Sequence, residues 1–455
     1  MLGRSGEVQS SFLLRVGAAT LGLAATFVAT VVANRSLDAR SASIFLAILA
    51  ALMLGPLIGR MGLGTSAIRQ ITAATAPGAA GGVAASHLWA TLVVSLMTAP
   101  LVAVVATAGA GTSDHRWLIA ALTAVIIVVE SLRLTMSDVL AAVGSIRLSV
   151  LLTHHVRTAL SVAVIVTYVN VTDAATLTVF LLVYLVVASL TLVVGLCAVR
   201  RVLRPRGRLD PAAVVAAVRG GMQMFTLALA AFVVGRADVW LAVVLFTAVD
   251  ASRYSTASVL AFQVTVLESL ASMALMPVIA TLWHRGDKRQ VLRLLNATAT
   301  LATWTTTLIV LVIWAFGSPL ITAAYTQSLA PAYLMLSILV VGGVALAALG
   351  GTSALMIVSG NVRPAARVTW LTLAVMAPLA GAAAWWGGPV ALAVASAAAT
   401  VAMIVAQWFT ARRLLGVAPH PQWNPLAALR TLRMAGRPDE RGTQYQWEGA
   451  ETDGG

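Results

Sequence analysis

Long apolar stretches, separated by short segments rich in arginine, glycine or proline, repeat along almost the whole chain. Because a helix needs about 20 apolar residues to cross a bilayer, each stretch predicts one membrane-spanning helix. Only 10% of the residues are charged, against about 25% in soluble domains, so a soluble enzyme, a DNA-binding domain and a disordered scaffold are excluded. We expect an all-α polytopic membrane protein with about twelve spans, at roughly 12–33, 43–66, 83–109, 117–143, 148–169, 176–199, 221–247, 255–282, 292–316, 332–358, 365–386 and 389–411.

The basic residues lie between these stretches, and they predict the orientation of the chain. The formal net charge of +14 comes almost wholly from arginine, since Lys288 is the only lysine. In a soluble chain this balance would indicate nucleic acid, but in a membrane protein Lys and Arg collect in cytoplasmic loops. The even-numbered loops are the basic ones, so we expect both termini in the cytoplasm and no nucleic-acid partner. Their basic residues include Arg69, Arg147, Arg157, Arg200, Arg201, Arg285, Arg289, Arg293, Arg363 and Arg367.

The two halves of the chain look like copies of each other. Asp38 after the first predicted span corresponds to Asp250 after the seventh, at an offset of 212 residues. Gly144 after the fourth corresponds to Gly360 after the tenth, at an offset of 216 residues. Copies with six helices start on the same side of the membrane, so the repeat is parallel, about a pseudo-twofold axis along the membrane normal. Two six-helix lobes that face each other across a central cavity form a transporter architecture.

These patterns divide the chain into four parts. We expect an N-terminal lobe over 1–200, a basic cytoplasmic linker over 201–220, a C-terminal lobe over 221–416 and a mostly disordered cytoplasmic tail over 417–455. The tail is poor in apolar residues, which disfavours a packed core. Within it, Asn424–Met434 has the spacing of a short interfacial helix, with leucines near one face and arginines toward lipid headgroups.

Ionisable residues inside predicted spans are the best functional candidates, because an unpaired charge in hydrocarbon costs at least about 2.5–3.5 kcal/mol. We place three of them as candidates for binding anionic groups and three as candidates for binding a coupling proton or sodium ion. The first three are Arg60, Arg133 and Arg236, and the second three are Glu130, Asp238 and Glu268.

Each candidate also has a purely structural interpretation. Glu130 and Arg133 are three residues apart, so they can neutralise each other on one helix face. Arg236 and Asp238 are two residues apart and point to different faces, so each needs a partner elsewhere. Glu268 either lines a cavity or pairs with Arg236, and Arg60 either faces a cavity or extends to the cytoplasmic surface.

Sequence motifs for catalysis or tightly bound groups are missing. The chain has no GxxxxGK[ST] phosphate loop, no HExxH and no GxSxG. Its loops are too short to form the catalytic domain of a membrane glycosyltransferase. Cys197 is the single cysteine, and no His/Cys/carboxylate grouping has metal-ligand spacing. We therefore expect no enzyme activity, no cofactor and no metal centre.

Several short motifs occur in the order found in one transporter family. The chain resembles the polysaccharide-exporter branch of the multidrug/oligosaccharidyl-lipid/polysaccharide superfamily, the O-antigen-type flippases, over roughly residues 10–415. The resemblance rests on Asn34-Arg35-Ser36-Leu37, Gly62-Leu63-Gly64 with Arg69, Arg236-Ala237-Asp238, Pro277 followed by Gly286-Asp287, and Gly360-Asn361.

This resemblance implies a flippase of the bacterial cytoplasmic (inner) membrane. It would move an undecaprenyl-diphosphate-linked oligosaccharide to the outer leaflet for surface polysaccharide such as lipopolysaccharide O-antigen. The implied mechanism is ion-coupled alternating access by two lobes. Its partners would be membrane lipids and glycan polymerases or glycosyltransferases.

Two other functions stay open. A multidrug cation antiporter has the same fold, and a non-transporting partner of a glycan assembly complex fits if the core charges only pair with one another. The charge of the cavity separates flippase from antiporter. Arginines that face it favour an anionic lipid, and unpaired carboxylates favour a cationic drug.

Overall fold

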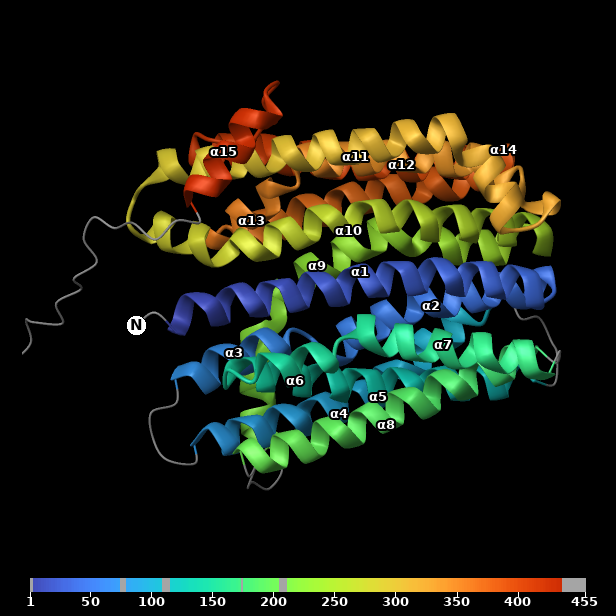
Figure 1. Cartoon of the computed structure of the whole chain (residues 1–455), viewed down its shortest axis with the longest axis horizontal. Helices are drawn as coiled ribbons and strands as arrows, with labels where there is room; N and C mark the ends of the chain where they lie inside the picture. Colours follow the sequence, from blue (N-terminus) through green and yellow to red (C-terminus); the bar gives the residue numbers. More distant parts are fainter. Residues whose placement is uncertain (1–2, 74–78, 109–114, 173–174, 204–210, 436–455) are drawn as a thin grey trace, which may run out of the picture.

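The structure is a computed structural model that describes residues 3–73, 79–108, 115–172, 175–203 and 211–435, and no strand occurs among them. Long helices run side by side along the molecule (Figure 1). In order they are α1 (Gly3–Ser36), α2 (Ala39–Arg60), α3 (Leu63–Ala73), α4 (Ala79–Ala106), α5 (Arg116–Ala142), α6 (Ile146–Leu151), α7 (His154–Thr172), α8 (Leu177–Leu203), α9 (Pro211–Leu245), α10 (Ala248–His284), α11 (Lys288–Ala324), the 3₁₀ turn η2 (Gln327–Leu329), α12 (Ala332–Leu349), α13 (Gly351–Val358), α14 (Val362–Leu415) and α15 (Pro425–Ala435).

The helices match the twelve predicted spans. Ten helices in the described part of the chain are long and apolar enough to cross a membrane. One of them, α14, has 54 residues and a kink at Gly388, where φ is 68° and ψ is −160°. At 1.5 Å per residue it would be about 80 Å long, so the kink divides it into two passes. Counting α14 as two passes gives eleven. Helix α10, which is not among the ten but has 37 residues, gives the twelfth. The all-α polytopic fold is confirmed.

Three predicted spans are interrupted inside the bundle. The second is broken at Met61 and Gly62, which have φ of 39° and 78° and so end α2 in left-handed backbone. The fifth is divided between α6 and α7, and the tenth between α12 and α13. Hydropathy misses the breaks at 61–62 and at 350 because the residues around them are mostly apolar.

Figure 1 shows two groups of helices, and we name them the first lobe (α1–α8) and the second lobe (α9–α14). The first lobe is centred on Phe45, whose ring meets those of Phe180 and Tyr184 edge-on at 5.4 and 5.9 Å. Helix α9 belongs to the second lobe but begins against the first, where Ala217 packs with Leu63 and Ala90. It starts at Pro211, a favoured first helical position for proline. The described residues from 211 to 220, expected as linker, are therefore helical.

Hydrogen bonds join the lobes at the end predicted to face outward. Asn34 of α1 donates to the Thr256 hydroxyl at 2.9 Å and accepts from the Ser252 hydroxyl at 2.7 Å, both on α10. The hydroxyls of Thr30 and Tyr325 are 2.5 Å apart. These contacts close the outer end between the lobes.

Backbone contact joins the lobes at the end predicted to be cytoplasmic. Gly62, after α2, lies directly against Gly221 of α9. A Cβ built on Gly221 would lie 2.6 Å from the carbonyl carbon of Gly62, so only glycine allows this approach. Arg69 of α3 also donates to the Gly220 carbonyl oxygen at 3.1 Å. Both ends of the interface between the lobes are therefore in contact.

The first part of the tail is more ordered than expected. The backbone N–H of His420 donates to Asn296 at 3.0 Å, and that of Gln422 donates to Thr300 at 2.8 Å. Both acceptors belong to α11. Helix α15 then forms at the place of the expected interfacial helix. The rest of the tail that we expected to be disordered, 436–455, lies outside the described residues.

Candidate functional site

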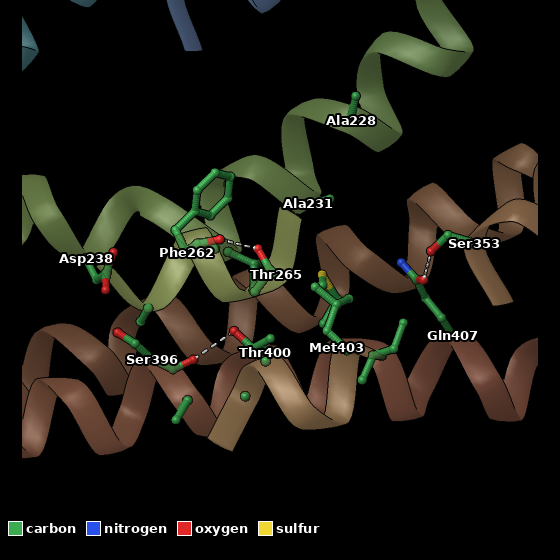
Figure 2. A pocket seen from close by; sticks show the side chains of 18 of the residues that line it. Ala228, Ala231, Asp238, Phe262, Thr265, Ser353, Ser396, Thr400, Met403 and Gln407 are labelled. Atoms are coloured by element: carbon green, nitrogen blue, oxygen red, sulfur yellow. Dashed lines mark hydrogen bonds between the residues drawn. The ribbon is translucent and has the colours of Figure 1, made fainter. Parts of the chain in front are cut away.

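A cavity of about 660 Å³ lies inside the second lobe, and we call it the second-lobe cavity (Figure 2). It is lined by α9, α10, α12, α13 and α14, with Thr65 of α3 at its edge. Most lining residues are small or apolar, such as Ala228, Gly342 and Met403. The remaining side chains are hydroxyls, one amide and one carboxylate, that of Asp238.

Asp238 projects from α9 into this cavity and is 7% exposed. One carboxylate oxygen accepts from the Tyr254 hydroxyl at 2.7 Å and from the Ser258 hydroxyl at 3.2 Å. The other accepts from the backbone N–H of Val239 at 2.9 Å. The Tyr254 hydroxyl is in turn 3.2 Å from that of Ser396 on α14. No Arg or Lys lines this cavity among the described residues. The hydroxyls can rotate, so this oxygen-rich cluster can accommodate a proton or a small hard cation.

A polar face of α14 extends from this cluster along the cavity wall. Ser396, Thr400 and Gln407 follow one another at spacings of four and seven residues, which places them on one helix face. Gln407 accepts from the Ser353 hydroxyl at 2.7 Å and donates to Thr369 at 2.8 Å. The spacing of these residues is visible in the sequence, but none of them is charged, so a search for buried charges does not find them.

A second, smaller pocket of about 250 Å³ lies between the lobes, and we call it the interlobe pocket. It contains Arg60 of α2 and Asp138 of α5, whose side chains form an ion pair at 2.8 Å. They are 23% and 30% exposed, so the pair is accessible. Thr65, Met224 and Ala228 line both this pocket and the second-lobe cavity, so the two adjoin.

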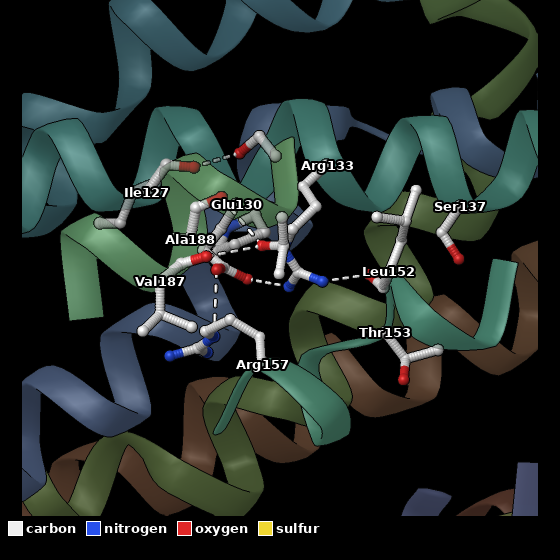
Figure 3. A network of polar contacts seen from close by, with 12 residues as sticks. Ile127, Glu130, Arg133, Ser137, Leu152, Thr153, Arg157, Val187 and Ala188 are labelled. Carbon is white, nitrogen blue, oxygen red and sulfur yellow. Dashed lines mark hydrogen bonds and ion pairs between the residues drawn. The ribbon is translucent and has the colours of Figure 1, made fainter. Parts of the chain in front are cut away.

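Glu130 and Arg133 lie in a closed network inside the first lobe (Figure 3). They form the expected ion pair, and Arg133 also donates to the carbonyl oxygen of Leu152, at the break between α6 and α7. Arg157, assigned to a loop from the sequence, is a third member, because its Nε lies 3.1 Å from Glu130. Its guanidinium also stacks on the Tyr184 ring at 4.9 Å. Glu130 and Arg133 line neither the second-lobe cavity nor the interlobe pocket.

Arg236 is buried between the lobes, 2% exposed. Its guanidinium lies over the Phe262 ring at 4.2 Å, a cation–π distance. One of its nitrogens is 3.9 Å from the sulfur of Met53 on α2. Phe262 lines the second-lobe cavity and Arg236 does not. Glu268 is on α10, but its side chain lies outside the described residues, so the expected Arg236–Glu268 pairing stays a prediction.

No protein-family model matches this chain, and no curated protein matches it. Its fold, however, is found in solved structures. An inward-facing multidrug resistance MATE family transporter of the MOP superfamily has a TM-score of 0.67 and 15% identity, and the match covers 89% of this chain and 98% of that one. The lipid II flippase MurJ in an inward closed conformation has a TM-score of 0.66 and 13% identity, and the match covers 93% of this chain and 90% of that one. A variant of the Vibrio cholerae MATE transporter VcmN has a TM-score of 0.60 and 17% identity, and the match covers 90% of this chain and 98% of that one. At these identities the likeness establishes the two-lobe fold.

Proposed function

We propose that this chain is an ion-coupled membrane transporter that moves an undecaprenyl-diphosphate-linked oligosaccharide from the cytoplasmic to the outer leaflet by alternating access. One observation carries the proposal. A largely apolar cavity with a single carboxylate, Asp238, adjoins an interlobe pocket that holds an accessible guanidinium, Arg60. The shared fold with MATE transporters and the flippase MurJ supports transport as the general activity.

The proposed substrate has two chemically different parts that suit the two pockets. Small apolar side chains along the second-lobe cavity give an acyl chain contacts without polar groups that would need hydrogen bonds. A guanidinium forms charge-assisted, bidentate hydrogen bonds with phosphate. Arg60 would make these bonds by exchanging Asp138 for the diphosphate, and Arg236 is a further donor if the Phe262 ring moves away.

Asp238 is the proposed site of ion coupling. Its only hydrogen-bond partners among the described residues are hydroxyls and the backbone N–H of Val239, so no Arg or Lys binds its oxygens directly. The buried Arg236 acts on this carboxylate electrostatically, without a direct ion pair. Glu130 is less suited, because Arg133 and Arg157 already neutralise it. Binding of an ion at Asp238 would remove a buried charge and so change the relative stability of the lobe arrangements.

A multidrug cation antiporter is the second candidate, and a specific observation favours it. The charged group of the larger cavity is a carboxylate, and the aromatic residue Phe262 also lines this cavity. An aromatic organic cation would find both a counter-charge and a stacking surface there. Substrate transport assays must therefore include both substrate classes.

Reconstitution in proteoliposomes tests the proposal. With an imposed proton or sodium gradient, the outward fraction of the lipid-linked oligosaccharide is read by its accessibility to an external glycosidase. We expect gradient-dependent flipping that Asp238→Asn reduces at least about tenfold, the effect of losing about 1.4 kcal/mol. Arg60→Gln should reduce flipping of the lipid-linked substrate.

The control is Asp250→Asn, which removes a surface ion pair with Arg253 away from both pockets. The flippase proposal would be overturned if the lipid-linked oligosaccharide flipped no faster than in empty liposomes. Gradient-driven uptake of a cationic dye in the same proteoliposomes would then favour the antiporter.

A further inference from the structure

Helix α15 is held in a fixed position at one end of the bundle, although it belongs to the tail. The residues before it are tied to α11 by the two backbone hydrogen bonds to Asn296 and Thr300, which are 5% and 0% exposed. They are tied to α14 by Trp408, whose indole N–H donates to the Pro419 carbonyl oxygen at 2.7 Å. Asn424 caps the helix by accepting from the Ala427 backbone N–H at 3.0 Å. The orientation of α15 is therefore set by the protein.

One face of α15 is packed and another is bare. Ala428 is 1% exposed, whereas Trp423, Leu426 and Leu429 are 93%, 66% and 37% exposed. These three residues follow one another at spacings of three, so they lie near one side of the helix and the turn before it. A tryptophan and two leucines so placed form an apolar surface without a protein partner in the described part of the chain.

The surroundings of this apolar surface are basic. In Figure 1 α15 projects from the rim of the bundle at the end where α11 begins. The start of α11, the end of α14 and α15 itself contribute exposed basic residues, and Asp287, the cap of α11, is the acidic residue among them. The basic residues are Lys288, Arg289, Arg293, Arg412, Arg413 and Arg430.

We propose that this apolar surface and the basic residues around it form a membrane-surface anchor that binds anionic phospholipid headgroups of the cytoplasmic leaflet. An amphipathic helix with Trp and Leu on one side and arginines beside them inserts at the boundary of headgroups and acyl chains. Each basic residue near an anionic surface adds to the attraction. Because the preceding segment is tied to α11 and α14, the anchor fixes these two helices relative to the membrane plane. This inference does not depend on what the protein transports.

Site-specific fluorescence in nanodiscs tests the anchor. The full chain carries Cys197→Ser and Leu426→Cys, labelled with an environment-sensitive dye, in nanodiscs with increasing phosphatidylglycerol in phosphatidylcholine. We expect dye emission to shift to the blue, quenching by brominated acyl chains to appear, and iodide quenching to fall as the anionic fraction rises. The same label at Gln327→Cys, an exposed position at the opposite end, is the control and should not respond.

Charge reversal separates headgroup recognition from simple burial. Arg289→Glu with Arg430→Glu should move the half-maximal response to at least about threefold more phosphatidylglycerol. The anchor would be overturned if iodide quenched the label at position 426 equally in all lipid mixtures and brominated lipid did not quench it at all. If the label were shielded from iodide as strongly in pure phosphatidylcholine as in mixtures with phosphatidylglycerol, the recognition of anionic headgroups would be overturned.

Discussion

Glu130 lies in a buried network of ion pairs, and we propose that its role is to stabilise the first lobe. Among the described residues it is the only carboxylate paired with Arg133 and Arg157, in a network that is 0–4% exposed. The network also satisfies the free carbonyl of Leu152 where α6 ends. A single carboxylate thus pairs with two buried guanidinium groups, and one of these, Arg133, donates to the carbonyl at a helix break.

Replacement of Glu130 by glutamine tests this role. Glu130→Gln leaves two buried arginines without a counter-charge, and removing one partner of a buried pair costs about 3–5 kcal/mol. The control Asp250→Asn breaks a half-exposed pair worth about 0–1 kcal/mol. The Tm of the purified protein is measured from the fraction that stays monodisperse after heating. It should fall far more for Glu130→Gln than for Asp250→Asn. Equal Tm values for the two variants would contradict a structural role.

The residues most easily misjudged from the sequence are those whose partners come from other helices. The i,i+3 spacing of Glu130 and Arg133 predicts their pairing, and the structure contains it. Arg157 joins them because α7 begins at His154 inside the bundle, a boundary that hydropathy does not locate. The Arg60–Asp138 pair brings together α2 and α5, 78 residues apart, and no local pattern indicates it.

At the scale of single elements, the start of α2 depends on its cap. The Asp38 carboxylate accepts from the backbone N–H groups of Arg40 and Ser41, both at 3.1 Å. Partial burial raises the pKa of Asp38, but the hydrogen bonds from Ser41 and Arg40 outweigh it, so the pKa lies below its ordinary value. The stabilisation by the ionised cap is complete above about pH 4 and is lost as the pH falls through the lowered pKa.

This cap gives a pH-dependent prediction. Asp38→Ala should lower stability at pH 7 by about 1 kcal/mol, the typical contribution of a helix cap. The difference in Tm between the native protein and the variant should shrink when both are heated at pH 3. A difference that is as large at pH 3 as at pH 7 would show that the charge of Asp38 has no part in the cap.

The contact between Gly62 and Gly221 is the element that closes the predicted cytoplasmic end. Gly221→Ala places a methyl group against the Gly62 backbone and should hold the lobes apart. In a Cys197→Ser background, Thr65→Cys in the interlobe pocket should then react several-fold faster with a membrane-impermeant thiol reagent in inside-out vesicles. The control is Gly220→Ala, whose added methyl would meet only the Ser66 hydroxyl, at 3.6 Å. Equal labelling rates in the two variants would exclude this contact as the closure.

At the scale of the whole molecule, hydropathy and the repeat predict the architecture because the bilayer imposes length and polarity on every span. They do not predict the second-lobe cavity, which arises where small residues of five helices fail to fill the space between them. They also do not predict how α9 crosses from one lobe to the other, since its glycines and alanines look like those of any span.

Alternating access requires the outer hydrogen bonds between the lobes to open and close. Asn34→Cys with Thr256→Cys, in the Cys197→Ser background, places two thiols where the side chains now hydrogen-bond at 2.9 Å. Oxidation should stop transport and reduction should restore it, because a disulfide would hold the outer end closed. Each single-cysteine variant is a control that should not respond to oxidant. Full transport in the oxidised double variant would mean that this end does not open.

The central claim, translocation of a lipid-linked oligosaccharide, is tested most directly in a bacterial strain that lacks this gene. The amount of undecaprenyl-diphosphate-linked oligosaccharide in the membrane and the amount of surface glycan are measured in the same cells. We predict that the lipid-linked intermediate accumulates on the cytoplasmic leaflet while surface glycan falls, and that the native gene, but not Asp238→Asn, restores both. Unchanged levels of both, with increased sensitivity to cationic compounds, would contradict the flippase and identify a drug antiporter.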